Sequence, residues 1–292
     1  MTLLVFGRTG QVACALRALT DSGAYGPVDY IGRDVGDLSQ PESCAEVIRA
    51  RAPHAVINAA AYTAVDRAED EEALATVINA TAPTAMALAC AASDIPFVHI
   101  STDYVFPGSG ITPWRPEDPV SPLNAYGRSK RAGEEGVMAA GGRWAILRTS
   151  WVFSETGSNF VKTMLRLSET RDALNVVADQ IGGPTPAAAI AAACLEIATQ
   201  LSQAPEKAGL YHFSGAPDAS WADFATTIFA CAGRSVSVTP IPSSAYPTPA
   251  QRPLNSRLDC QSLETAFGIT RPDWRAALPK IVHPQGADHE HA

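Results

Sequence analysis

The residues best suited to chemistry in this sequence begin with a tyrosine and a lysine. Tyr126 and Lys130 stand four residues apart in the stretch NAYGRSKRAGE (124–134). Residues four apart share one face of a helix, and Asn124 is a candidate N-cap for such a helix. An ammonium group near a phenol favours the phenolate, so the phenol pKa is expected to move from near 10 toward neutral pH. The pair is a candidate general acid, although this spacing alone also fits a packed tyrosine beside a surface lysine.

A second group of reactive side chains ends an apolar run. The segment STDYVF (101–106) follows PFVHI and supplies Thr102, Asp103 and Tyr104. Strand interiors do not need such groups, whereas sites at strand ends do. Tyr104 has no lysine four residues later, so Tyr126, with Lys130 as its partner, is the predicted catalytic tyrosine.

A glycine-containing loop precedes both groups. The stretch GRTGQVA (7–13) follows a first apolar run and opens a helical segment. Such a turn lets backbone N–H groups and the helix dipole meet a pyrophosphate, which predicts a dinucleotide site. Ala13 replaces the third glycine but is small enough for helix–strand packing. An ordinary glycine turn is the alternative. The predicted cofactor contacts in this loop are Gly7, Thr9, Gly10, Gln11 and Val12.

The end of the second apolar run bears on the choice of nicotinamide cofactor. An acidic residue at this place favours the ribose of NAD, whereas an arginine favours the 2′-phosphate of NADP. Arg33 and Asp34 compete here, and Arg8 could add a second positive charge. NADPH is therefore favoured, NADH stays open, and the alternative is a solvated Arg33. Asp37 and Leu38 are expected at the adenine edge.

Small residues end the third apolar run and would let a cofactor lie across it. The predicted contacts are Ala59, Ala60, Ala61 and Tyr62, together with Thr102, Tyr126 and Lys130. Asn58 stays open between a cofactor contact and a partner for strand-end backbone groups. The cation of an oxidised nicotinamide would add to the effect of Lys130 on Tyr126.

Alternation of apolar runs and helical segments predicts an α/β fold. Runs without polar alternation indicate strands buried on both faces, and their repetition predicts a doubly wound parallel Rossmann sheet with a smaller interleaved C-terminal substrate lobe. The expected strands are 2–6, 28–32, 54–61, 96–102 and 143–153, followed by 174–179 and 210–215. The predicted division is 1–153 plus 174–215 for the dinucleotide-binding domain, 154–173 plus 216–284 for the lobe, and 285–292 for a flexible tail.

Composition disfavours several other classes of protein. The 292 residues carry a net charge of −8 without a basic run, which argues against a nucleic-acid partner. Six cysteines without a C-x-x-C pair predict reduced thiols in a cytoplasmic protein. No signal peptide, membrane span or metal site is expected.

These motifs together resemble the extended short-chain dehydrogenase/reductases. Ordered segments along nearly the whole chain, including INAAAYTAVDRAE, LNAYGRSKRAGE, DQIGGPT and QRPLNSRLD, look most like the dTDP-4-dehydrorhamnose reductase family. The resemblance implies NAD(P)H-dependent reduction of the C4 ketone of dTDP-4-dehydro-β-L-rhamnose. The product would be dTDP-L-rhamnose, a sugar nucleotide for cell-surface polysaccharides.

The resemblance also implies a role for each site residue. Tyr126 would be the proton donor, Lys130 the ribose anchor and pKa modulator, and Thr102 the hydroxyl that bonds the substrate oxygen. The implied substrate contacts are Asp103, Tyr104 and Trp151, with Arg252 as a candidate for a nucleotide phosphate. Related dehydratases carry Asp-Glu after the threonine, a pair that expels water, whereas this chain has Asp103-Tyr104. The tyrosine favours simple reduction.

Two rival functions stay open. The first is a sugar-nucleotide epimerase or dehydratase, which would recycle its NAD. The second is a non-catalytic subunit like the regulatory subunit of methionine adenosyltransferase, which resembles this family. By resemblance only, Mg²⁺ at a subunit contact and a homodimer are compatible with the sequence.

Overall fold

A computed structural model describes residues 2–283 apart from 22 and 24, so the predicted tail 285–292 lies outside the described residues. Its main feature is a six-stranded sheet in which all neighbouring strands run parallel. In spatial order the strands are β10 (Gly209–His212), β5 (Trp144–Thr149), β4 (Phe97–Thr102), β3 (Ala55–Asn58), β1 (Leu3–Phe6) and β2 (Val28–Ile31). The predicted doubly wound parallel sheet is thereby confirmed.

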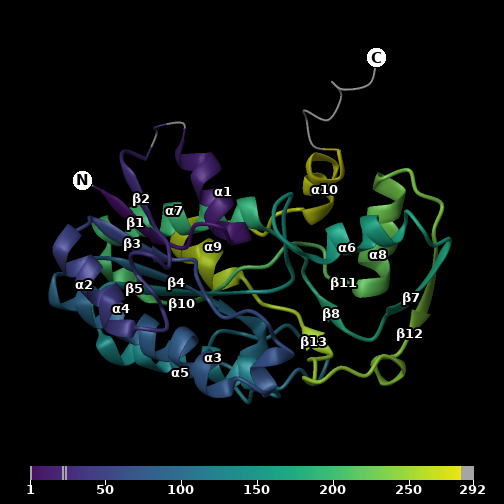
Figure 1. Cartoon of the computed structure of the whole chain (residues 1–292), viewed down its shortest axis with the longest axis horizontal. Helices are drawn as coiled ribbons and strands as arrows, with labels where there is room; N and C mark the ends of the chain where they lie inside the picture. Colours follow the sequence, from purple (N-terminus) through teal and green to yellow (C-terminus); the bar gives the residue numbers. More distant parts are fainter. Residues whose placement is uncertain (1, 22, 24, 284–292) are drawn as a thin grey trace.

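Helices cover both faces of this sheet (Figure 1). One face packs on α1 (Gln11–Thr20) and α7 (Ala187–Gln203). The other packs on α2 (Pro41–Arg51), α4 (Ala82–Ala92) and α5 (Ala125–Ala140). Strands β1 and β3 are buried at every residue, as expected for apolar runs between two helical layers.

The strand order creates a switch point between β1 and β3. The chain leaves β1 for β2 on one side and later returns to β3 on the other. Ligands of open α/β sheets bind outside the carboxyl ends of the strands at such a point. The glycine loop and the end of β3 both lie there.

A second set of elements forms a smaller lobe beside the sheet (Figure 1). Its helices are α6 (Phe160–Leu167), α8 (Trp221–Cys231) and α10 (Trp274–Val282). Its strands are β7 (Ala173–Val177) with β12 (Ser237–Ile241), β11 (Ala219–Ser220) with β8 (Ile181–Gly182) and β13 (Asn255–Ser256), and β6 (Val152–Phe153) with β9 (Thr185–Pro186). Aromatic side chains such as Phe153, Phe224 and Trp274 form its separate core.

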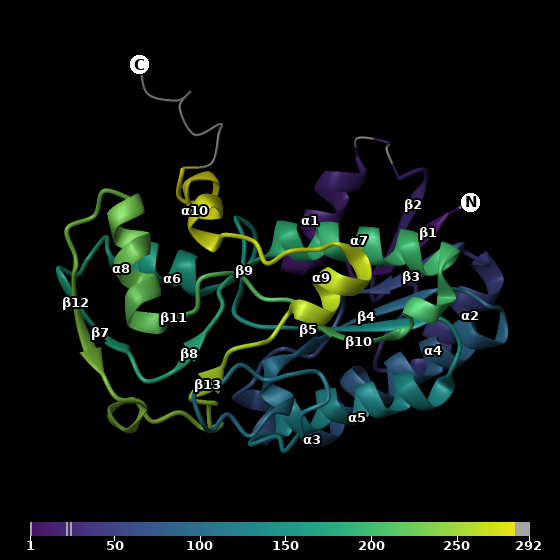
Figure 2. The ribbon, with the colours of Figure 1, turned by 180° about the vertical axis from the view of Figure 1, so that it is seen from behind.

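Three predicted segments need correction: two lie on the other side of the predicted domain division, and one predicted strand is interrupted. The strand expected in the Rossmann part at 174–179 pairs with β12 and packs on α8, so it belongs to the lobe. Conversely α9 (Gln261–Phe267), expected in the lobe, packs against β10 and α7 through Leu263 and Phe267 (Figure 2). The strand expected at 143–153 splits at Trp151, whose φ of 49° interrupts the extended backbone. None of these three differences can be predicted from hydrophobic periodicity.

One helical run is long and apolar enough to cross a membrane by length and composition alone. It spans Glu72–Ala92, through α3 (Glu72–Thr76), a π-helical turn (Val77–Thr81) and α4. Half of its apolar window is buried inside the molecule. Since α4 packs between α2 and α5, the run fits a core helix of the layered fold.

Candidate active site

The glycine loop is shaped for close approach at the switch point. Gly7 has a φ of +118°, and a Cβ there would lie 3.4 Å from the Cβ of Ala13 and 3.5 Å from the backbone of Ala59. Ala13 is fully buried, so the missing third glycine is accommodated. Gly10 caps α1 without a side-chain hydrogen bond. The first backbone N–H groups of α1 therefore have no side-chain acceptor at the N-cap. Such N–H groups at a helix start can bind an anion.

The neighbouring edge of the sheet carries exposed charges. Arg8 donates two hydrogen bonds to Asp34, at 2.7 and 2.9 Å, and one to the carbonyl of Tyr30. Arg33 is 83% exposed, and its Nε lies 4.0 Å from Asp37. The Ser39 amide, which donates to Asp37, is the main cause of the lowered Asp37 pKa. Arg33 is thus open to an incoming group, whereas Arg8 already has a carboxylate partner.

Asn58 at the end of β3 is buried rather than presented to a ligand. Its Oδ1 accepts the backbone N–H of Ala60 at 3.1 Å, and its Nδ2 lies 3.2 Å from Nδ1 of His99. Of its two open interpretations, the structure favours the partner of strand-end backbone. Tyr62, farther along, donates to Glu71 at 2.6 Å and packs, like Tyr126, against a small cluster of buried alanines.

Thr102 lies at the centre of the reactive corner. It ends β4, and its Oγ1 accepts the backbone N–H of Tyr104 at 3.2 Å while donating to Asp103 at 3.1 Å. The same hydroxyl acts on the phenol of Tyr126, whose pKa it lowers. Burial raises the pKa of the Asp103 carboxyl to about 6. The corner thus joins the Thr102 strand end to the start of α5.

The pKa of Tyr126 differs from expectation. Asn124 caps α5 through the amide of Gly127, which sets Tyr126 in the first turn. Burial raises the Tyr126 pKa to about 12, against the smaller effect of its hydrogen bond to Thr102. The expected shift toward 7 is therefore wrong for the protein groups alone. The reason is that desolvation of the phenolate dominates and the Asp103 carboxyl adds to the rise, while only the Thr102 hydroxyl opposes it.

Lys130 lies one turn farther along α5, only 2% exposed. Its Nζ donates to the carbonyl of Ile100 at 2.6 Å and lies 3.4 Å from Nε2 of His99. Burial lowers its pKa to about 8, and the carboxylate of Glu134 opposes that shift. The lysine is thus hydrogen-bonded to the backbone of β4, two residues before Thr102.

Two predicted substrate residues meet next to Tyr126. The ring of Tyr104 packs edge-on against that of Tyr126, with centroids 5.6 Å apart. Arg252 donates to Asp66 at 2.8 Å and lowers the pKa of Tyr104 electrostatically, although burial raises it more. Arg252 therefore reaches the reactive corner from the C-terminal part of the chain, with a carboxylate partner that sequence reasoning missed.

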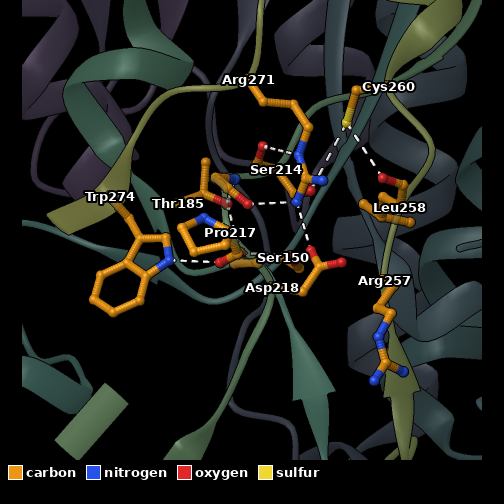
Figure 3. A network of polar contacts seen from close by, with 12 residues as sticks. Ser150, Thr185, Ser214, Pro217, Asp218, Arg257, Leu258, Cys260, Arg271 and Trp274 are labelled. Carbon is orange, nitrogen blue, oxygen red and sulfur yellow. Dashed lines mark hydrogen bonds and ion pairs between the residues drawn. The ribbon is translucent and has the colours of Figure 1, made fainter. Parts of the chain in front are cut away.

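Trp151 stacks on a tryptophan that sequence reasoning did not select. The rings of Trp151 and Trp221 lie 3.5 Å apart at 9°. A network of polar contacts also lies at the junction of sheet and lobe (Figure 3). There Arg271 bonds the carbonyls of Ser214 and Gly215 and the Asp218 carboxylate, at 3.1, 2.6 and 2.5 Å.

Sequence reasoning also missed the buried charges beneath the corner. Arg148 on β5 makes two hydrogen bonds to Glu134 on α5, at 2.8 and 2.7 Å, and both side chains are at most 1% exposed. Ser101 donates to the same carboxylate at 2.6 Å. An arginine inside the apolar run WAILRT was the one available signal, because a buried charge needs a partner.

The possible metal ligands and the cysteines are the remaining reactive side chains. In the part of the chain that the structure describes, no three His, Cys, Asp or Glu side chains are grouped so as to hold a metal ion. All six cysteines are free thiols.

Fold and site together define the extended short-chain dehydrogenase/reductase class. A doubly wound sheet presents a glycine loop at the switch point, and a strand-end threonine adjoins a helix with Tyr126 and Lys130. The model of the RmlD substrate binding domain family matches residues 1–286. The chain belongs to that family, and the predicted resemblance to dTDP-4-dehydrorhamnose reductases is confirmed.

Relatives and solved structures agree with this placement. The dTDP-4-dehydrorhamnose reductase of Sinorhizobium fredii is 44% identical over 97% of both chains, and that of Escherichia coli K12 is 40% identical over 97% of both. A Clostridium acetobutylicum dTDP-4-dehydrorhamnose reductase structure superposes with a TM-score of 0.90 at 35% identity, covering 97% of this chain and 98% of its own. One from Bacillus anthracis, in complex with NADP, has a TM-score of 0.88 at 33% identity, covering 96% and 98%.

Proposed function

We propose that this protein is an NADPH-dependent reductase that converts the C4 ketone of dTDP-4-dehydro-β-L-rhamnose to the alcohol of dTDP-L-rhamnose. The observation that carries the choice of reaction is Tyr104, packed against Tyr126 at 5.6 Å where related dehydratases have a glutamate. Without that acid, water elimination lacks its second acid–base group. The names of the relatives, and the NADP in the Bacillus anthracis structure, support the substrate and cofactor.

The residues present fit a dinucleotide. Gly7 has a φ of +118° that residues with a side chain rarely adopt, and Gly10 leaves the start of α1 without a side-chain cap. Arg33, exposed at the end of β2, is the candidate for the 2′-phosphate, while Arg8 is shared with Asp34. The cofactor, when bound, supplies the hydride. Gly7, Thr9, Gly10, Gln11 and Val12 would contact it with Asp37, Leu38, Ala59, Ala60, Ala61, Tyr62 and Lys130.

The protein's own part in the reaction is proton transfer and orientation. The raised pKa of Tyr126, about 12, keeps its phenol protonated at neutral pH, as a proton donor requires. Thr102, whose hydroxyl lowers the pKa of that phenol, would bond the same substrate oxygen. Lys130 would anchor the ribose beside them. Asp103, Tyr104, Trp151 and Arg252 would line the sugar and phosphate side.

The test is nicotinamide absorbance with dTDP-4-keto-6-deoxy-sugar, the preceding 3,5-epimerase, and NADPH or NADH in parallel. Tyr126→Phe should bind NADPH but lose about 10²–10⁴-fold in kcat, the usual contribution of a positioned acid. Tyr211→Phe, which removes a phenol bonded to the Lys207 carbonyl on the far edge of the sheet, is the matched control. Near-wild-type kcat in Tyr126→Phe would overturn the proposal.

The rival functions give different outcomes in the same assay. An epimerase or dehydratase would transform a sugar nucleotide without net nicotinamide consumption. A regulatory subunit would show no turnover and would co-purify with a larger catalytic partner. A homodimer, a cytoplasmic location and Mg²⁺ at a subunit contact stay predictions.

A further inference from the structure

A buried histidine and asparagine continue the polar contacts that begin at Lys130. His99 Nε2 lies 3.4 Å from Lys130 Nζ, and His99 Nδ1 lies 3.2 Å from Asn58 Nδ2. The three side chains are at most 2% exposed. Because solvent is excluded, the protein neighbours alone decide which ring nitrogen of His99 carries the hydrogen.

Asn58 fixes that choice. Its Oδ1 accepts the backbone N–H of Ala60 at 3.1 Å, and a backbone amide can only donate. The amide oxygen must therefore face Ala60, which leaves the Nδ2 donor facing His99. Nδ1 of His99 is then the acceptor, so a neutral ring carries its hydrogen on Nε2. Burial, with Lys130 nearby, keeps the ring neutral by lowering the pKa of His99 well below its usual value.

The Nε2–H of His99 consequently faces Lys130. A neutral amine has a lone pair that can accept this hydrogen, whereas an ammonium has three donors and no acceptor. We propose that His99, oriented by Asn58, is a positioning residue that favours the neutral amine of Lys130 and so sets how easily this lysine gains and gives up a proton. The part of Lys130 in turnover rests on the proposed reductase function, but the tautomer of His99 does not.

Lys130 is thereby balanced between two opposing neighbours. Glu134, one turn farther along α5, favours the ammonium and is itself held by Arg148 from β5 and Arg131 from α5. His99 from β4 favours the amine. Burial sets the Lys130 pKa at about 8, so both forms are accessible near neutral pH. Turnover should fall on the alkaline side as the ammonium is lost.

His212 provides an internal reference, because its neighbours predict the opposite tautomer. Its Nδ1 lies 3.0 Å from the carbonyl of Trp114, and its Nε2 lies 3.4 Å from Nη1 of Arg148. A carbonyl only accepts and a guanidinium only donates, so His212 carries its hydrogen on Nδ1. Burial lowers its pKa to about 3, and it stays neutral as well.

The first experiment reads both tautomers directly. Long-range ¹H–¹⁵N NMR spectra of the uniformly ¹⁵N-labelled full chain distinguish Nδ1–H from Nε2–H imidazoles, and His99→Phe and His212→Phe assign the two rings. We expect Nε2–H for His99 and Nδ1–H for His212. Nδ1–H or a charged ring at His99 at pH 7 would overturn the inference, whatever substrate the enzyme reduces.

The second experiment reverses the tautomer. In Asn58→Asp the carboxylate accepts from both Ala60 N–H and Nδ1–H, so Nε2 becomes an acceptor for the Lys130 ammonium. The alkaline limb of kcat/KM for NADPH-dependent reduction should rise by about one pH unit, the size expected for a newly favourable neighbour. A tautomer that does not change, or a changed tautomer with an unmoved limb, would contradict the proposal.

A double variant separates tautomer from added charge. In the His99→Phe background, Asn58→Asp should move the alkaline limb far less than in the wild type, because no ring is left to reorient. An equal shift in both backgrounds would assign the effect to the carboxylate acting through space and would overturn the role of His99. If the NMR tautomers are as expected but no reduction is found, the proposed function fails instead.

Discussion

Two arginine–carboxylate pairs with the same 2.7 Å contact lie in opposite surroundings. Arg148 and Glu134, beneath the reactive corner, are 1% and 0% exposed. Arg8 and Asp34 are 42% and 64% exposed. They lie with Arg33 at the edge of the sheet where the nucleotide is proposed to bind, here called the nucleotide edge. A buried pair cannot lose one partner without leaving a charge away from water. An exposed pair is screened and its partners can be exchanged. Contact distance therefore says little about what each pair does.

The difference extends to the two halves of the site. Around β4 and α5, the side chains of Thr102, Lys130 and His99 are fixed by protein partners, so the acid–base geometry exists within the chain itself. At the nucleotide edge, Arg33 is largely exposed, and its Nε lies 4.0 Å from the carboxylate of Asp37. The side chains of the first region are thus held in place by the chain itself, whereas Arg33 in the second region is not.

The largest effect should come from breaking the buried pair. Glu134→Leu leaves Arg148 without its carboxylate and should lower the free energy of unfolding by about 3–5 kcal/mol, measured by urea denaturation. Glu72→Leu, the same substitution in the exposed pair with Arg128, should lower it by less than about 1 kcal/mol. Equal losses at the two positions would remove the contrast between buried and exposed pairs.

Loss of the Thr102 hydroxyl should impair turnover more than stability. Thr102→Val keeps the shape but removes the hydroxyl that bonds the Tyr104 amide and would bond the substrate oxygen, so kcat should fall about 10²–10³-fold, as for loss of one oxyanion donor. Thr20→Val is the control, since both threonines are 6% exposed and Thr20 lies at the end of α1. A kcat within twofold of wild type in Thr102→Val would exclude the threonine from the reaction.

The buried carboxyl of Asp103 predicts a pH-dependent difference in stability. Its pKa is raised from 3.8 to about 6, so the folded state binds more protons than the unfolded state between these values. Its contribution is favourable at low pH and is lost as the pH rises through about 6. Relative to wild type, Asp103→Asn should therefore gain at most about 3 kcal/mol between pH 4 and 7. A difference that is flat across this range would show that Asp103 titrates normally.

The smallest effect is expected at the nucleotide edge. Arg33→Ala should raise the KM for NADPH about tenfold and leave that for NADH nearly unchanged, because a charge-assisted hydrogen bond contributes about 1.5–3 kcal/mol and this one is exposed. Arg49→Ala on α2, another exposed arginine with a carboxylate neighbour, is the control. Equal changes for both cofactors would place Arg33 away from the 2′-phosphate.

Prediction from sequence succeeded where a pattern reports a local requirement. Unalternating apolar runs predicted buried parallel strands, and the glycine loop was found at the switch point. Prediction failed where segments distant in sequence meet. The strand at 174–179 pairs with β12, Trp221 stacks on Trp151, and Asp66 pairs with Arg252. Each of these contacts follows from the path of the chain between sheet and lobe. Local hydrophobic periodicity does not specify that path.

The sequence by itself determined the kind of fold, the candidate residues and their family, because residue types at fixed spacing suffice for these. Tertiary structure alone decided the environment of each group. Burial moves the pKa of Tyr126 up and that of Lys130 down. Asn58, on a neighbouring strand, orients the ring of His99. Proton affinity depends on desolvation and on donors and acceptors gathered from several elements, so it exists only once the chain has folded.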